Sequence, residues 1–266
     1  MNRLPFPVNV IHKLLLLMLI MPLSAGAEDN REAASSNRQS PWSLSMQGGF
    51  VDQFDTDLDE QGGFSINRFF IQGGPVYSPG YRRSIGLTLG YGFDRYDFTE
   101  KSVFPNQTPW EDIHTVRLGV PVRWGTEKDW TVFILPSLRF TAESGADWHD
   151  ALTGGAFVGA SYRFSDRLTI GPGIGIMSQL EDNATVFPLL LIEWKITGRL
   201  SLSTGPGPAA TQGPGLILDW RPADRWHLLF GGRYEKQRFR LDEIGGMKGG
   251  IGENTSLPLF TGATFE

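Results

Sequence analysis

The stretch SYRFSDRLTIGPGIGI, Ser161 to Ile176, contains two short runs of alternating residues joined across residues 165–167. From Leu168 onward every second residue is apolar or proline, and the residues between them are threonine and glycine. A period of two is typical of a β-strand, because successive side chains point to opposite faces. The stretch therefore predicts a hairpin with one apolar face and one face of small and polar residues.

The same alternation recurs along the chain from Trp42 onward. It is clear in residues 81–98, 115–124, 130–140, 156–164, 216–221 and 226–235. Two segments are weaker, since FSINRFFIQ (residues 64–72) mixes its faces and TVFPLLLIEWKI (residues 185–196) is apolar on both until Glu193. No segment shows a helical period. The pattern predicts an all-β protein of about twelve strands, within a range of about ten to fourteen.

The connections between these strands alternate in length. Short turns fall at residues 78–80, 125–128, 165–167, 197–198 and 222–224. Longer, mostly polar links fall at residues 55–63, 99–112, 142–150, 180–183, 205–212 and 239–254. Tight turns at one rim and larger loops at the other are typical of an antiparallel up-and-down transmembrane β-barrel, whose tight turns face the periplasm. A secreted β-sandwich is the soluble alternative, but its loops do not sort by length.

The N-terminus and the composition bear on location. Residues 1–27 combine a basic leader, an apolar stretch from Leu14 to Leu23 and a small-residue site at Ala25-Gly26-Ala27, which predicts a secretory signal peptide cleaved before Glu28. The polar, Ser-rich residues 28–41 are expected to form a flexible tail, and residues 42–266 the barrel. With a net charge of -5 the chain has no basic excess, which argues against nucleic acid as a partner. It contains no cysteine, so disulfides and thiolate metal sites are excluded.

Aromatic residues are placed next to the short turns, on the apolar parity of their strands. An aromatic ring at headgroup depth buries its body in lipid while its polar edge stays wet, so barrels carry such rings as an interfacial girdle. The predicted girdle consists of Trp124, Trp130, Tyr162, Phe164, Trp194, Trp220 and Trp226.

On these patterns the chain from Trp42 onward resembles the outer-membrane β-barrel proteins of Gram-negative bacteria. It is most similar to families described only as outer-membrane β-barrel domains. The resemblance implies a location in the outer membrane, with membrane lipid and the barrel-assembly machinery as partners, and very little biochemistry. One departure concerns the last strand, which commonly ends on an aromatic residue in such barrels. Here Phe265 is followed by Glu266, which leaves open whether a C-terminal hairpin is missing.

If the apolar parity faces lipid, the opposite parity faces the lumen. Charges there either pair across strands and brace the barrel or line a watery path. The predicted lumen-facing residues are Arg82, Asp94, Arg117, Arg123, Arg139, Arg163, Glu193, Asp219, Arg221, Arg233 and Glu235.

The lumen and the loops predict a non-enzymatic role. The leading hypothesis is a narrow channel for small polar solutes or a structural barrel with a filled lumen. The alternative is a surface interaction protein whose loops bind a partner through Trp110 and Trp148. A barrel-embedded lipid hydrolase is the third hypothesis, but His114 and its neighbour Thr115 should point to opposite faces of a strand. No cofactor or metal is expected, since the acidic run Asp55 to Glu60 lacks the glycine and distant glutamate of a calcium loop.

Overall fold

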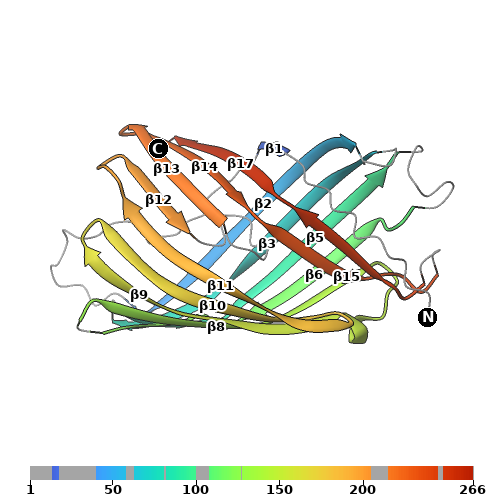
Figure 1. The fold of residues 1–266 in the computed structure, drawn as a ribbon, viewed down its shortest axis with the longest axis horizontal. Helices are drawn as coiled ribbons and strands as arrows, with labels where there is room; N and C mark the ends of the chain where they lie inside the picture. The colour runs from blue at the N-terminus through green and yellow to red at the C-terminus, as the bar shows by residue number, and fades with distance from the viewer. Residues whose placement is uncertain are drawn as a thin grey trace.

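The structure is a computed structural model, which describes residues 14–17, 40–57, 63–80, 82–99, 108–126, 128–204, 215–244 and 248–265. Within these residues the chain forms one sheet of 17 strands and one four-residue 3-10 helix, η1 (Trp148–Ala151) (Figure 1). The strands are β1 (Leu14–Leu17), β2 (Trp42–Asp57), β3 (Gly63–Gly80), β4 (Arg83–Gly86), β5 (Thr88–Phe98), β6 (Asp112–Gly119), β7 (Val122–Gly125), β8 (Trp130–Glu143), β9 (Leu152–Ser165), β10 (Leu168–Gln179), β11 (Asp182–Lys195), β12 (Leu200–Thr204), β13 (Gly215–Ala223), β14 (Trp226–Arg233), β15 (Glu235–Arg240), β16 (Ile251–Ser256) and β17 (Pro258–Phe265).

Most strands pair with their neighbours along the chain in antiparallel register, so the prediction of an all-β, antiparallel fold is confirmed. The number of strands is larger than about twelve because several long strands are interrupted. β4 and β5 are separated by Leu87 alone, β14 and β15 by Tyr234, and β16 and β17 by Leu257. β6 and β7 are separated by Val120 and Pro121.

Proline accounts for two of these interruptions, because it has no N–H to give to a ladder. The amide of Gly86 donates to the carbonyl of Pro121 at 2.9 Å, and that of Leu87 donates to the carbonyl of Pro75 at 3.0 Å. The amide of Val120 donates to the carbonyl of Pro136 at 3.0 Å. These bonds hold neighbouring strands together across the interruptions, so the sheet continues.

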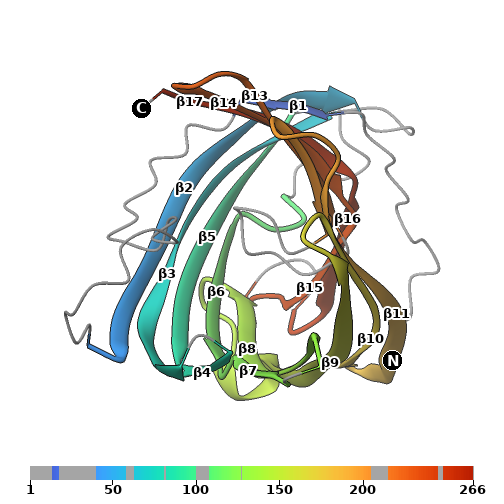
Figure 2. The same ribbon diagram turned by 90° about the vertical axis from the view of Figure 1, so that its left-hand side faces the viewer.

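The sheet curls round on itself, which gives it a concave inner face and a convex outer face (Figure 2). Large apolar side chains on the outer face are exposed, as in Leu44 at 69% and Leu89 at 59%. On the inner face, glycine lets neighbouring segments approach closely. A Cβ on Gly171 would lie 1.9 Å from the carbonyl oxygen of Ala160, and one on Gly175 would lie 2.4 Å from the ring of Phe187.

The hairpin of β15 and β16 lies inside the curl of the sheet (Figure 2). β15 continues the course of β14 beyond Tyr234 and meets β8 at Arg240, whose Cα partner is Ala142. The prediction treated residues 239–254 as a polar loop and is wrong at this point. The glycines in this segment predict a loop, but Gly252 has a packing role. A Cβ on Gly252 would lie 2.1 Å from the ring of Phe239, so the glycine leaves room for this buried ring.

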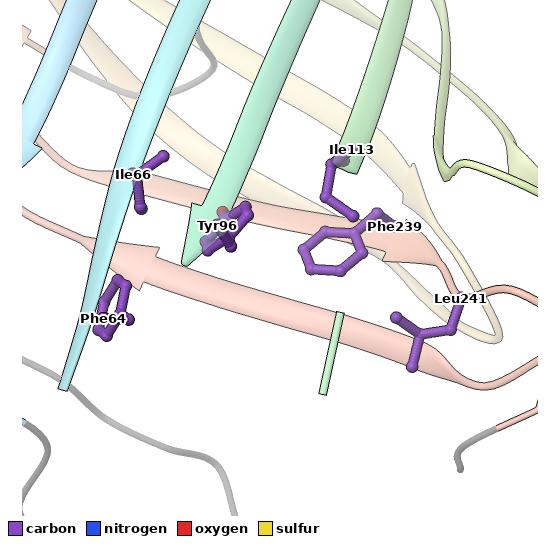
Figure 3. Close-up of a cluster of buried hydrophobic side chains, with 6 residues drawn as sticks. All are labelled: Phe64, Ile66, Tyr96, Ile113, Phe239 and Leu241. Carbon is purple, nitrogen blue, oxygen red and sulfur yellow. The ribbon is translucent and has the colours of Figure 1, made fainter. Parts of the chain in front are cut away.

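A cluster of apolar side chains fixes the hairpin against the inner face. It consists of Phe64, Ile66, Tyr96, Ile113, Phe239 and Leu241, which come from β3, β5, β6, β15 and the residue after β15 (Figure 3). Trp110 packs against this cluster from the link between β5 and β6, with its ring centroid 5.2 Å from that of Phe239. The mixed faces of residues 64–72 follow from this packing, because Phe64 and Ile66 face the hairpin.

The ends of the sheet lie near each other. β1, within the predicted signal peptide, pairs with β17 in parallel from Leu14 opposite Pro258 to Leu17 opposite Thr261, and it also contacts β2. β17 itself pairs with β14 and ends at Phe265, opposite Trp226. The other residues of the predicted signal peptide, and residues 28–39 of the predicted tail, lie outside the described part of the chain.

Candidate functional site: a buried charge cluster on the inner face

The inner face carries a group of buried charges that joins the wall of the sheet to the hairpin. Arg68 on β3 donates from Nε to Oδ1 of Asp94 on β5 at 2.8 Å, and from a terminal nitrogen to Oε2 of Glu235 on β15 at 3.0 Å. Arg233, at the end of β14, donates to the other carboxylate oxygen of Glu235. Since all four side chains are largely buried, each charge depends on its partners for solvation.

Two further arginines adjoin this group. Arg117 on β6 and Arg139 on β8 are directly opposite each other in the antiparallel register. The Nε atoms of both are buried and have no hydrogen-bond partner, and the same holds for Oγ1 of Thr141, two residues along β8. Like charges opposite each other on paired strands repel, and neither arginine has a carboxylate of the described residues in direct contact.

The structure brings together some of the predicted lumen residues and separates others. Asp94, Arg233 and Glu235 belong to the buried group, and Arg139, which is buried, and Arg117, which is half-buried, adjoin it. A second set occupies the same parity of its strands nearer the short turns, where the side chains are more open to solvent. This set is Arg123, Arg163, Glu193, Asp219 and Arg221, while Arg82 lies in the turn before β4.

Arg68 is the central residue of the group and was missed at the sequence level. It stands in residues 64–72, the segment whose mixed faces obscured its parity. No signal in the sequence marked it, because its pairing with Asp94 follows from the register of β3 with β5, which only the structure gives. Its second partner, Glu235, is 167 residues away, and no local pattern connects the two.

The predicted aromatic residues lie near the short turns of the sheet. Trp130 and Tyr162 are register partners with ring centroids 5.1 Å apart, and Tyr162 contacts Phe164 at 4.9 Å. Trp124 lies under the guanidinium of Arg83 at 4.1 Å. The remaining members, Trp194, Trp220 and Trp226, are exposed on their strands. Trp42 and Tyr77, which the prediction left out, add a further ring pair at 4.9 Å.

A serine, a histidine and a tyrosine meet at the opposite end of the sheet. His114 on β6 lies with Nε2 2.9 Å from Oγ of Ser144 and with Nδ1 2.8 Å from the hydroxyl of Tyr91. Ser144 follows β8 directly, and its amide donates to the carbonyl of Asp112 at 2.9 Å. His114 and Tyr91 share a pleat parity opposite to that of Arg117 and Thr115, so this group lies on the outer face. The sequence did not reveal it because Ser144 and His114 are 30 residues apart.

The two aromatic anchors expected on the long loops have different surroundings. Trp110 is half-buried in the inner apolar cluster, with edge contacts to Tyr96 and Phe98, so it is not an exposed anchor. Trp148 is 39% exposed at the start of η1. Before that helix, Asp147 accepts from the amide of His149 at 2.9 Å, and this bond lowers the pKa of the Asp147 carboxyl.

No protein-family model matches this chain, and no curated protein matches it. Within the described ranges, no helix is long and apolar enough to cross a membrane. Among the same residues, no group of three or more histidine and acidic side chains could hold a metal ion. Asp59 and Glu60 of the acidic run lie outside the described residues. The candidate functional residues are therefore those that the fold brings together on the inner and outer faces.

Proposed function

We propose that this protein is a bacterial outer-membrane β-barrel whose charged lumen forms a narrow passage for small polar solutes. The observation that carries the proposal is the contrast between the two faces of the sheet. The outer face exposes large apolar side chains with a ring of aromatics near the short turns, and the inner face buries charged groups. Lipid around the outer face and a polar lumen inside the sheet would account for that contrast.

The strand count of the proposed barrel is twelve. Of the sixteen strands from β2 to β17, four pairs are interrupted by only one or two residues, and counting each pair once leaves twelve. β1 belongs to the predicted signal peptide and lies beside both β17 and β2. Its removal by cleavage before Glu28 would leave these two strands free to pair with each other. An even number of antiparallel strands is typical of bacterial outer-membrane barrels.

The location is tested by fractionation and gel migration. The mature protein is expected in the outer membrane, beginning at Glu28, and should migrate faster before heating than after it, because folded barrels resist denaturation by detergent. A mature protein recovered soluble from the periplasm would contradict the proposal. The same samples, analysed by N-terminal sequencing, test the cleavage site.

The passage is tested by conductance in planar bilayers. The buried group and the two arginines beside it carry four guanidinium groups, from Arg68, Arg117, Arg139 and Arg233, and two carboxylates, from Asp94 and Glu235. This surplus of positive charge should favour anions, because charged rings in a pore bias the sign of the permeating ion.

Replacing Arg117 and Arg139 by glutamine should shift the reversal potential toward cations. Replacing Arg163, which is exposed near a short turn, should shift it less. If the inserted protein conducts no current, the channel is rejected. The structural alternative then remains, which is a barrel whose lumen is filled by the hairpin.

A second candidate function rests on the contacts of His114. In an acyl-ester hydrolase a general base lies beside a serine hydroxyl, and a third group orients the base. His114 would take the proton of Ser144 at Nε2 while its Nδ1–H donates to the oxygen of Tyr91. Ser144 Oγ would then attack the ester carbonyl, release the alcohol with that proton, and pass the acyl group to water. The position on the outer face near the long loops would give access to lipid esters.

The hydrolase is tested with a fluorophosphonate probe and a long-chain ester in detergent micelles. Labelling and hydrolysis are expected for the parent protein and should be lost in Ser144→Ala and His114→Asn. Thr115→Val, next to the histidine but on the inner face, should retain both. Absence of labelling and hydrolysis in correctly folded parent protein would exclude this function and leave the channel proposal intact.

A further inference from the structure

We infer that the inner face holds an oxyanion-binding site formed by Arg117, Arg139 and Thr141. Within the described residues, four buried side-chain polar atoms have no hydrogen-bond partner, and three of them belong to these residues. The three residues lie on paired strands, since Arg117 is opposite Arg139 and Thr141 is the next inner-face position on β8. Unpartnered donors therefore gather at one place instead of being scattered.

The donor groups of these three residues indicate the class of ligand, which is an oxyanion. A guanidinium group donates through a planar fork that matches the oxygens of a phosphate or carboxylate, and a threonine hydroxyl adds a donor that can turn toward the same atoms. Arg139 is only 7% exposed, so its charge is poorly solvated by water. A bound oxyanion would relieve the repulsion between the two arginines and satisfy all three groups.

The nearby carboxylates are already committed to other arginines. Asp94 accepts from Arg68, and Glu235 accepts from Arg68 and Arg233. No ion pair joins Arg117 or Arg139 to any residue in the described part of the chain. Asp94 and Glu235 attract both arginines from a distance, but neither carboxylate makes a direct contact with them. The unpartnered donors can therefore take a ligand from outside the chain.

The surroundings of the site bear on the route of entry. On the long-loop side of the site lie Ile113, Tyr96 and Phe239, which are buried members of the apolar cluster (Figure 3). On the short-turn side the next inner positions are Gly119 on β6 and Ser137 on β8, which are small and are register partners. The side chain of Leu135 lies 3.5 Å from the position that a Cβ on Gly119 would occupy, so an oxyanion that enters from the short-turn end must pass this side chain.

This site rests on the proposed barrel, because it needs an enclosed lumen, but it does not require conductance. The test uses full-length mature protein folded in maltoside micelles, with inorganic phosphate as the probe in isothermal titration at constant ionic strength. Saturable binding is expected. Arg117→Gln, Arg139→Gln and Thr141→Val should each weaken it, by about tenfold or more for the arginines. Arg123→Gln, an exposed inner-parity residue near the short turns, should bind phosphate like the parent.

A second arm distinguishes the source of the ligand. Lysophosphatidic acid in the same micelles presents phosphate on a lipid, and binding of this probe alone, lost in Arg139→Gln, would assign the site to a headgroup. If the glutamine variants do not fold, Arg117→Lys and Arg139→Lys replace them. Lysine keeps the positive charge but lacks the planar guanidinium that donates two parallel hydrogen bonds, so weaker binding is expected for these variants too. No saturable binding of either probe, or equal binding in all folded variants, would overturn the inference. If phosphate binds but the inserted protein conducts no current, the binding site is retained and the channel is rejected.

Discussion

At the scale of single residues, the stability of the hairpin depends on Arg68 and Glu235. Replacing Glu235 by glutamine leaves Arg68 and Arg233 with one fewer buried counter-charge, and breaking a buried pair in this way costs about 3–5 kcal/mol. We expect a clear fall in the urea midpoint of unfolding. Arg95→Gln is the matched control, because its pair with Asp112 is exposed and should contribute only about 0–1 kcal/mol. Equal effects of the two substitutions would show that the buried group does not brace the sheet.

The stability of the segment around η1 is expected to depend on pH through Asp147, the residue before this helix. The hydrogen bond from the His149 amide lowers the pKa of Asp147, so the folded state favours the ionised carboxyl. Its contribution to stability is therefore present above the ordinary carboxyl pKa of about 3.9 and is lost as the pH falls through the lowered value. The amide proton resonance of His149 should titrate with a midpoint below about 3.9. In Asp147→Asn that titration should vanish, and a midpoint at or above the ordinary value would contradict the bond.

At the scale of elements, the hairpin of β15 and β16 is attached to the wall by its apolar side chains. Phe239 is fully buried between β3, β5 and β6, and Phe→Ala in a packed core costs about 3–5 kcal/mol. We expect Phe239→Ala to speed hydrogen exchange at the amides of β15 and β16 while those of β9 and β10 keep their protection. Ile244→Ala, at an 82% exposed position beyond β15, serves as the control and should change neither. Uniform loss of protection in both regions would mean that the hairpin and the wall unfold together.

At the scale of the whole molecule, the orientation of the sheet is the feature to test. Leu89 lies on the outer face of β5, and an arginine there should cost about 2–4 kcal/mol if that position is near the bilayer midplane. Asp97→Arg has the same parity on the same strand but lies near the long-loop end, where the cost should be about 0–1 kcal/mol. The measurement is the free energy of unfolding after folding into lipid vesicles. An unchanged value for Leu89→Arg would place that face away from lipid.

The alternation of residues was enough to predict an antiparallel sheet and, for most strands, which side chains share a face. A period of two is a local property, so Leu168 to Ile176 reveal an outer and an inner face without knowledge of their neighbours. Short turns and the aromatics beside them, such as Trp130 and Tyr162, are likewise visible within a few residues. Much of the inner group, including Asp94, Arg117 and Arg139, was accessible to the same parity argument.

What lies on the inner face, and which charges there have partners, depends on contacts between distant parts of the chain. Residues 239–254 are polar and glycine-rich, so their composition predicts a loop, although Phe239 and Leu241 are buried against β3, β5 and β6. Arg68 forms an ion pair with Glu235, 167 residues away in the sequence, and His114 contacts Ser144, 30 residues away. Such contacts depend on how the sheet curls and where the hairpin turns inward, and neither is encoded in the spacing of nearby residues. Burial then determines which polar groups lack partners, which is why Arg117 and Arg139 stand out only in the folded molecule.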